Sequence, residues 1–176
     1  MKYTKTVLIT SIFYLFFINN HLHGQSKSKE ELGNSLVESI LSKNIESFKV
    51  LLLPKKVVLK LLENNTPENI NKEERDSLMK QSESAYDNIF ISQYENNFLK
   101  IVQLTETNKI DWSNLKFEIL YKYSSKQHEY DPFLIHTRLI NSDYNHFYFS
   151  AVRYKGKWFL EDEMEITKDE KYAPND

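Results

Sequence analysis

The chain is 176 residues long and contains 23 Lys and Arg, 25 Asp and Glu, and no Cys. That length fits one folded domain and leaves little room for a second catalytic module. A formal net charge of −2 gives no electrostatic basis for binding nucleic acid, and an aromatic content of 14% argues against intrinsic disorder. Without Cys, the chain has no disulfide, thiol nucleophile or thiolate metal ligand.

Residues 1–24 have the layout of a cleaved secretory signal peptide. Lys2 and Lys5 precede an apolar run over residues 7–18, and polar residues follow as far as Gly24. The run is shorter than the ~17 residues that a membrane-spanning helix needs, so we expect cleavage near Gly24 rather than a permanent anchor. Secreted eukaryotic domains of this size often use disulfides. The absence of Cys therefore favours a protein exported by a Gram-negative bacterium, either periplasmic or secreted.

Residues 25–163 are predicted to form a single domain whose first half is helical. Ser28 and Glu31 form a capping box in front of apolar residues at helical spacing. Asn44 is placed to cap a short second helix, and Pro54 is suited to the first turn of a third. Three helices are therefore expected before residue 65.

Apolar residues at helical spacing continue over residues 72–104. One helix over that range would be about 50 Å long, which is long for a compact domain of this size. Ser92 and Glu95 form a second possible capping box. We therefore expect a break in the helix at Ser92.

The second half of the chain is predicted to form strands, because the apolar period changes from helical to two. The expected strands cover residues 116–123, 133–140, 146–154 and 157–161, and Lys155 with Gly156 suits a two-residue hairpin turn. The fold class is therefore α+β, with N-terminal helices packed on an antiparallel sheet of about four strands. Residues 164–176 are expected to form a polar tail.

A symmetric turn centred on Asp143 would place Leu139 opposite Phe147, and the next hairpin would place Arg153 opposite Trp158. The face assigned to the helices then carries Phe133, Ile135, Leu139, Phe147, Phe149, Ala151, Trp158 and Leu160. The opposite face carries His136, Arg138, Tyr148, Ser150, Val152, Tyr154, Phe159 and Glu161. Its aromatic residues make it a candidate contact surface.

A known family shares these features. The N-terminal helices, the Ile110-Asp111-Trp112 turn, the strand meander and the terminal segment 154–162 resemble the NTF2-like, cystatin-type α+β cone found in exported proteins of Bacteroidetes-type bacteria. This resemblance implies a curved sheet wrapped around helices to enclose a pocket. It leaves function open, because some members are isomerases or dehydratases, many bind small ligands and many only mediate association. No catalytic motif of the family can be matched to this chain residue by residue.

Two sets of residues are candidate sites. Arg153 lies opposite Trp158 on the helix-facing side, where a guanidinium must stack, pair or contact a ligand, so the pair together with Phe149 is a candidate site for a small apolar or anionic ligand. Arg138, Tyr148, Tyr154 and Phe159 are the candidate interaction face for a second copy of the chain or for another envelope protein.

Neither catalysis nor metal binding is expected. His136, Ser150 and Glu161 would share one rung of the sheet, but the serine would then lie between the histidine and the acid, which is the wrong order for a triad. His128 with Glu129 and Asp131, and His146 with Asp143, combine ligand types in loops where polar residues are expected anyway. We therefore predict no catalytic residue, no metal site and no cofactor.

The sequence favours an exported, non-catalytic binding or interaction domain, which would bind a small ligand in the cone or a protein through the sheet face. Two alternatives remain open. One is a small isomerase or hydrolase that uses a His or Asp in the cone. The other is an accessory or immunity-type protein that acts by occluding a partner.

Overall fold

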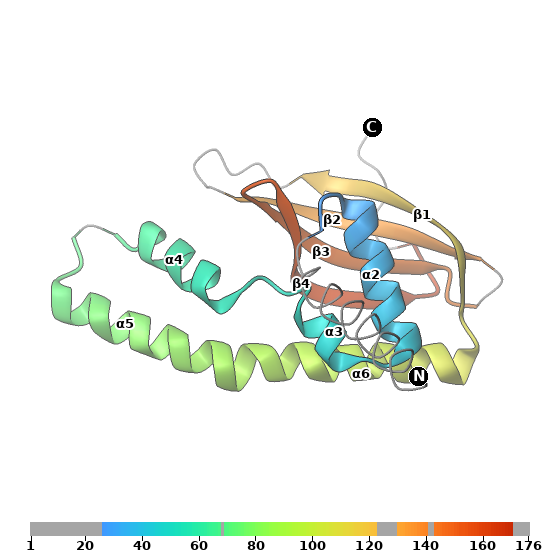
Figure 1. Cartoon of the computed structure of the whole chain (residues 1–176), viewed down its shortest axis with the longest axis horizontal. Helices are drawn as coiled ribbons and strands as arrows, with labels where there is room; N and C mark the ends of the chain where they lie inside the picture. Colours follow the sequence, from blue (N-terminus) through green and yellow to red (C-terminus); the bar gives the residue numbers. More distant parts are fainter. Residues whose placement is uncertain (1–25, 68, 123–129, 141–142, 171–176) are drawn as a thin grey trace, which may run out of the picture.

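The computed structural model describes residues 26–67, 69–122, 130–140 and 143–170. The fold is α+β, with helices packed on an antiparallel sheet (Figure 1). The elements in chain order are α2 (Lys29–Ser42), α3 (Ile45–Lys49), α4 (Lys55–Asn65), α5 (Lys72–Ala85), η1 (Tyr86–Phe90), α6 (Ile91–Asn108), β1 (Asp111–Lys122), β2 (Tyr130–Ile140), β3 (His146–Tyr154) and β4 (Lys157–Thr167). No helix in these ranges is both long enough and apolar enough to span a membrane.

The sheet has four described strands in the order β1-β2-β3-β4, which is the predicted meander. The β3–β4 register is also as predicted, with Arg153 opposite Trp158 across a turn in which Lys155 and Gly156 both have positive φ. The β2–β3 register differs by two residues, because Phe147 lies opposite Thr137 rather than Leu139. A shift of two residues keeps every side chain on its predicted face, since the side-chain period of a strand is two.

The face of the sheet that packs against α2, α3 and α6 forms the main core. Seven of the eight residues predicted for this face are buried in one cluster with those helices: Ile135, Leu139, Phe147, Phe149, Ala151, Trp158 and Leu160. The eighth, Phe133, has a side chain outside the described set. The helices contribute fully buried residues, including Leu32, Leu36, Phe48 and Phe98. Alternation along the strands was therefore sufficient to locate the core.

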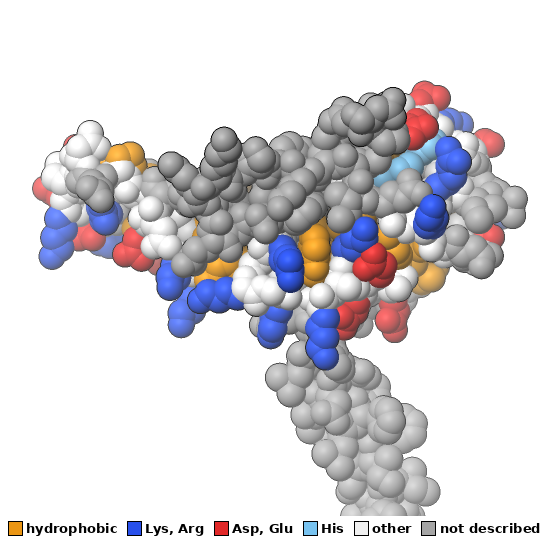
Figure 2. Space-filling model, turned by 90° about the horizontal axis from the view of Figure 1, so that it is seen from above, with side chains coloured by type: hydrophobic (Ala, Val, Ile, Leu, Met, Phe, Trp, Pro, Cys, Tyr) orange, Lys and Arg blue, Asp and Glu red, His pale blue; other side chains and the backbone are white. Residues whose placement is uncertain are grey.

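The opposite face of the sheet is not an open surface. At one end, Val152, Tyr154 and Phe159 are buried against Leu53 and Leu61 of the α4 region. At the other end lie His136 and His146, on the neighbouring strands β2 and β3. Figure 2 shows pale blue histidine atoms at the end of the molecule away from the α4–α5 tip. This face is therefore divided into an apolar half under α4 and a histidine-containing half.

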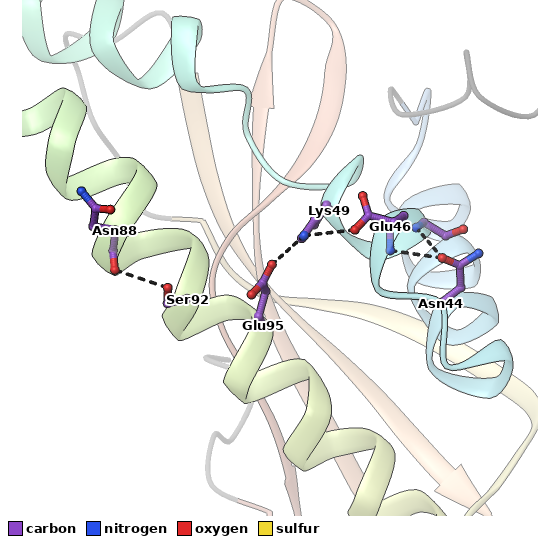
Figure 3. Close-up of polar contacts among 7 residues, drawn as sticks. Asn44, Glu46, Lys49, Asn88, Ser92 and Glu95 are labelled. Carbon is purple, nitrogen blue, oxygen red and sulfur yellow. Dashed lines mark hydrogen bonds and ion pairs between the residues drawn. The ribbon is translucent and has the colours of Figure 1, made fainter.

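The first two helices begin at the predicted caps. Ser28 Oγ accepts a hydrogen bond from the Glu31 amide at 3.1 Å, and Asn44 Oδ1 accepts bonds from the amides of Glu46 and Ser47 at 3.1 Å each (Figure 3). Helices α2 and α6 each end at a lysine in the left-handed conformation, Lys43 with φ 54° and Lys109 with φ 51°. Local capping therefore places the starts of α2 and α3 at the residues that the sequence predicted.

The expected break at Ser92 is wrong. Helix α5, the π-helical segment η1 and α6 form one continuous helix from Lys72 to Asn108, about 55 Å long at 1.5 Å per residue. Ser92 lies inside it, and its hydroxyl donates back to the Asn88 carbonyl at 3.3 Å instead of capping a new helix (Figure 3). The irregularity lies earlier, at η1, where the Ile91 amide bonds to the Tyr86 carbonyl.

Strand β4 corrects the predicted end of the domain. It continues to Thr167, and Met164 and Ile166 are buried in the main core, so residues 164–167 are strand and not tail. The start of β4 is covered along its edge, because the Leu160 amide donates to the Leu51 carbonyl at 2.8 Å and the Trp158 amide donates to the Ser26 carbonyl at 2.8 Å. The edge strand is thus hydrogen-bonded at residues 158–160 by the chain that flanks the helices.

Candidate functional site

Helices α4 and α5 form an antiparallel pair that extends beyond the end of the sheet (Figure 1). Lys55 at the start of α4 connects the two helices, with its Nζ 2.6 Å from Asp87 Oδ2 and 3.2 Å from Glu83 Oε1. The hydrogen bond to Asp87 raises the pKa of Lys55 above its ordinary value. Tyr86 adds a second link by donating its hydroxyl to the Leu53 carbonyl at 2.8 Å. These contacts fix the distance between the two helices at their base.

A groove of about 260 Å³ runs between this pair of helices. Val58 and Leu62 line it from α4, and the long helix lines it with Ser82, Ala85, Tyr86, Ile89, Phe90 and Gln93. We call these eight residues the α4–α5 groove. The residues that the long helix contributes are spaced as on one face of a helix, so the groove presents a single, mainly apolar seam.

The π-helical segment lies in the wall of the groove. Tyr86, Ile89 and Phe90 all belong to η1. Single π-helical turns inside α-helices occur frequently at functional sites, because they alter the direction of the side chains around them. Here the ring of Phe90 packs 5.2 Å from that of Tyr86 and 4.5 Å from that of Tyr94, which is buried in the main core. An aromatic row therefore connects the groove to the core.

Large apolar side chains remain exposed in and beside the groove. Ile89 is 56% exposed, Leu62 42% and Leu78 41%. None of the residues of α5 is buried. Helices of this length in water usually gain their stability by burying an apolar face. The apolar face of α5 is thus only partly covered by α4, and the groove is the most incompletely packed part of the described structure.

The three residues predicted to bind a ligand do not line a hollow of this kind. Phe149 is fully buried and Trp158 is 9% exposed, and both pack in the main core among helix side chains. Arg153 is exposed at the end of β3, opposite Trp158 as expected. Neither the α4–α5 groove nor a second hollow, which lies along α5, includes any of the three.

The predicted interaction face is distributed over different environments. Tyr154 and Phe159 are buried under α4, whose apolar side covers that half of the sheet. Tyr148 is 2% exposed and stacks on His136, whereas Arg138 is exposed. Three of the four residues are therefore interior. The sequence did not indicate this, because it contains no signal that α4 folds back over the sheet.

The residue combinations considered for a triad or a metal site, and set aside, lie as follows in the described residues. Ser150 lies opposite Leu134, and His136 lies opposite Tyr148, so His136 and Ser150 do not share a rung. Asp143 lies near Lys168, at 3.8 Å, whereas His146 contacts His136. His128 and Glu129 are outside the described residues.

The α4–α5 groove was not predicted, although part of its signal is present in the sequence. The sequence has apolar residues at helical spacing over residues 72–104, and the usual role of such a stripe is core packing. The sequence does not say that the helix continues past the sheet. Comparisons with family models, with curated proteins and with solved structures give no match for this chain.

Proposed function

We propose that this chain is an exported, non-catalytic interaction domain, and that the α4–α5 groove binds an amphipathic helix of a partner protein. The observation that supports this most directly is the exposure of Leu62 and Ile89 on either side of an apolar seam. Monomeric proteins rarely leave adjacent large apolar side chains uncovered unless that surface binds something.

The shape of the groove favours a helix as its occupant. Ser82 and Ala85 are small and lie on the groove side of α5, which allows the backbone of a third helix to approach closely. Val58 and Leu62 are one turn apart on α4, and Ala85 and Ile89 are one turn apart on the long helix. Two such ridges accept the i, i+4 and i+7 side chains of an amphipathic helix, a common mode of peptide recognition.

A small ligand fits the groove less well. Pockets that enclose small molecules are ~300–1,000 Å³ and bury most of the ligand. This groove measures about 260 Å³ and is open along its length. A free lipid or metabolite bound there would keep much of its surface in water, whereas a helix would cover Leu62 and Ile89 and bury its own apolar face.

Site-specific photo-crosslinking tests the proposal in cells of the source organism. A photoreactive phenylalanine analogue replaces Gln93, which lines the groove, and in a control chain it replaces Leu99, which is 53% exposed on α6 but is not part of the groove. We expect a crosslinked protein of defined mass from position 93 and not from position 99. We expect Ile89→Lys, introduced into the chain with the analogue at position 93, to abolish this crosslink, because a charged side chain in the seam opposes burial by a partner helix.

Three results would contradict the proposal. The first is equal crosslinking from positions 93 and 99, and the second is a product that survives Ile89→Lys. The third is a product of twice the mass of the chain, which would mean that the groove binds a second copy of the chain and not a partner protein. Circular dichroism of Ile89→Lys serves as the folding control, and we expect a folded variant because the side chain it replaces is already more than half exposed.

Export and family membership belong to the same proposal. Export is supported by the charge and apolar pattern of residues 1–24, and N-terminal sequencing of the protein from the envelope fraction tests it, with Gln25 as the expected first residue. An intact N-terminus would refute cleavage. The NTF2-like resemblance is supported by helices on one face of an antiparallel meander that ends in the Lys155–Gly156 hairpin.

A further inference from the structure

We propose that His136, His146 and Glu170 form a binding site for a divalent first-row transition metal, with Zn²⁺ as the expected ion. The ligand atoms of the three side chains all lie within 4.8 Å of one another. They come from β2, from the start of β3 and from the segment after β4. The site is separate from the α4–α5 groove, since it occupies the opposite half of the sheet from the part that α4 covers.

One nitrogen of each imidazole already lies beside a nitrogen of the other ring. His136 Nε2 lies 3.0 Å from His146 Nδ1, and the two ring centroids are 5.1 Å apart with an interplanar angle of 20°. A short distance between nitrogens combined with a longer one between centroids means that the rings meet edge to edge, which is the geometry of a hydrogen bond between them. One nitrogen donates a proton to the other. A metal ion would take the place of that proton, which would move to the other nitrogen of the donor ring or be released to solvent.

The spacing is close to that of a zinc site. Zn–N bonds of about 2.0–2.1 Å at a tetrahedral angle place two ligand nitrogens about 3.3–3.4 Å apart. The observed 3.0 Å therefore needs to widen by about 0.3–0.4 Å, and the two rings need to turn so that both lone pairs point at the ion. The two rings have few alternative positions, because His136 stacks on Tyr148 at 4.6 Å and the two histidines are only 3% and 6% exposed. Buried, fixed imidazoles lower the entropy that metal binding must overcome.

The turn after β4 holds Glu170 beside the histidines. Thr167 is the cross-strand partner of His146. The Thr167 hydroxyl donates to the Asp169 carbonyl at 3.1 Å and accepts from the Asp169 amide at 3.2 Å, which closes a tight turn. The Thr167 carbonyl accepts from the Asn145 amide at 3.1 Å, which ties this turn to the β2–β3 connection. Glu170 thus follows a fixed segment and projects from the accessible side.

Two histidines and one carboxylate suit zinc and its neighbours among the divalent ions. Three protein ligands leave at least one coordination position for water or for a donor from another molecule. The exposed carboxylate lies on the solvent side and the two histidines are buried, so that position is expected to face solvent. The structure therefore assigns a metal-binding role to a histidine pair for which the sequence predicted none.

A zinc titration of the purified chain tests this site. The chain is prepared without a polyhistidine tag, treated with EDTA and desalted, and Zn²⁺ is added in competition with a chromophoric chelator. We expect one ion per chain. Glu170→Gln should weaken binding by at least about tenfold, and His146→Asn should weaken it further, because loss of a direct ligand exceeds the ~10–100-fold effect of losing an outer partner. Asp143 is an exposed acid at the same end of the sheet, so the control variant Asp143→Asn should bind Zn²⁺ as tightly as the unmodified chain does.

Two outcomes would overturn the proposal: no stoichiometric zinc binding by the unmodified chain, or unchanged affinity in both ligand variants. Glu170→Gln decides the question if His146→Asn fails to fold, because Glu170 is exposed and its replacement leaves the core intact. Co²⁺ provides a second readout. Its visible absorption should show four-coordinate nitrogen and oxygen ligation in the unmodified chain, and this spectrum should be lost in Glu170→Gln.

Discussion

Gly33 in α2 provides a sharp test of how the helices pack on the sheet. A methyl group added there would lie 2.6 Å from Cζ and 2.8 Å from Cδ1 of Phe117 in β1. Ordinary carbon contacts are about 3.5–4 Å, so the ring would have to move by roughly 1 Å. It is restricted on one side by Phe149, which it meets edge-on at 6.3 Å between centroids and which is fully buried.

Two effects oppose each other in Gly33→Ala. Overpacking of this kind costs about 1–3 kcal/mol, whereas replacing Gly by Ala inside a helix gains about 1 kcal/mol. We expect a net loss of about 1 kcal/mol in the free energy of unfolding, which lowers Tm by about 2–4 °C in a domain of this size. The change in the free energy of unfolding is measured by urea denaturation, with circular dichroism as the signal.

Two controls separate the contact from helix propensity. Asn34→Ala, at the neighbouring exposed position of α2, should gain about 0.5 kcal/mol, because it changes propensity alone. Repeating Gly33→Ala in a Phe117→Leu background should remove most of the penalty, which gives a coupling energy of at least ~0.5 kcal/mol. A gain of about 1 kcal/mol from Gly33→Ala in both backgrounds would refute the packing of α2 against Phe117.

Four further results are expected. Asn44→Ala should cost about 1 kcal/mol in urea denaturation, since it removes the two hydrogen bonds that cap α3, and a loss below ~0.3 kcal/mol would contradict that role. Phe98→Ala should lower the free energy of unfolding by about 3–5 kcal/mol, because the Phe98 ring is fully buried and stacks on the Phe48 ring with centroids 4.6 Å apart. A small loss would mean that the core repacks easily. The hydrogen bond to Asp87 raises the pKa of Lys55. The stabilisation from this pair should therefore be complete below the pKa of Lys55 in the unfolded chain and lost as the pH rises through its pKa in the folded chain. The free energy of unfolding measured from pH 8 to pH 12 should fall less steeply for Lys55→Gln than for Lys56→Gln, and equal slopes would contradict the pairing. Zn²⁺ at about 100 times its Kd should raise the Tm of the unmodified chain by about 5–10 °C, and a shift that is unchanged by Glu170→Gln would place the metal elsewhere.

Features set by neighbouring residues were predictable from the sequence. The caps at Ser28 and Asn44, the hairpin at Lys155–Gly156 and the core face of the sheet all follow from local hydrogen bonding or from alternation along a strand. The end of β4 was also within reach, because Met164 and Ile166 alternate with Glu163 and Glu165. That short alternation was assigned to the tail on account of its charge.

Features set by contacts between distant residues were not predictable. Whether the helix breaks at Ser92 depends on how α6 packs against α3 and β4, and whether Tyr154 is exposed depends on how α4 covers the sheet. The histidine pair was missed because the assumed turn was centred on Asp143. The actual pairing places His136 opposite Tyr148 and Arg138 opposite His146, which brings the two rings into contact.

The left-handed lysines have a consequence for engineering. A residue with a side chain is strained by roughly 1–2 kcal/mol when its backbone is in the left-handed conformation. Lysine occupies this conformation at the ends of α2 and α6 and in the last hairpin, where Lys155 has φ 47°. Glycine adopts this conformation without the penalty, although it is more flexible when unfolded. Lys109→Gly and Lys155→Gly are therefore routes to a thermostabilised version of the chain that leave both proposed binding surfaces untouched.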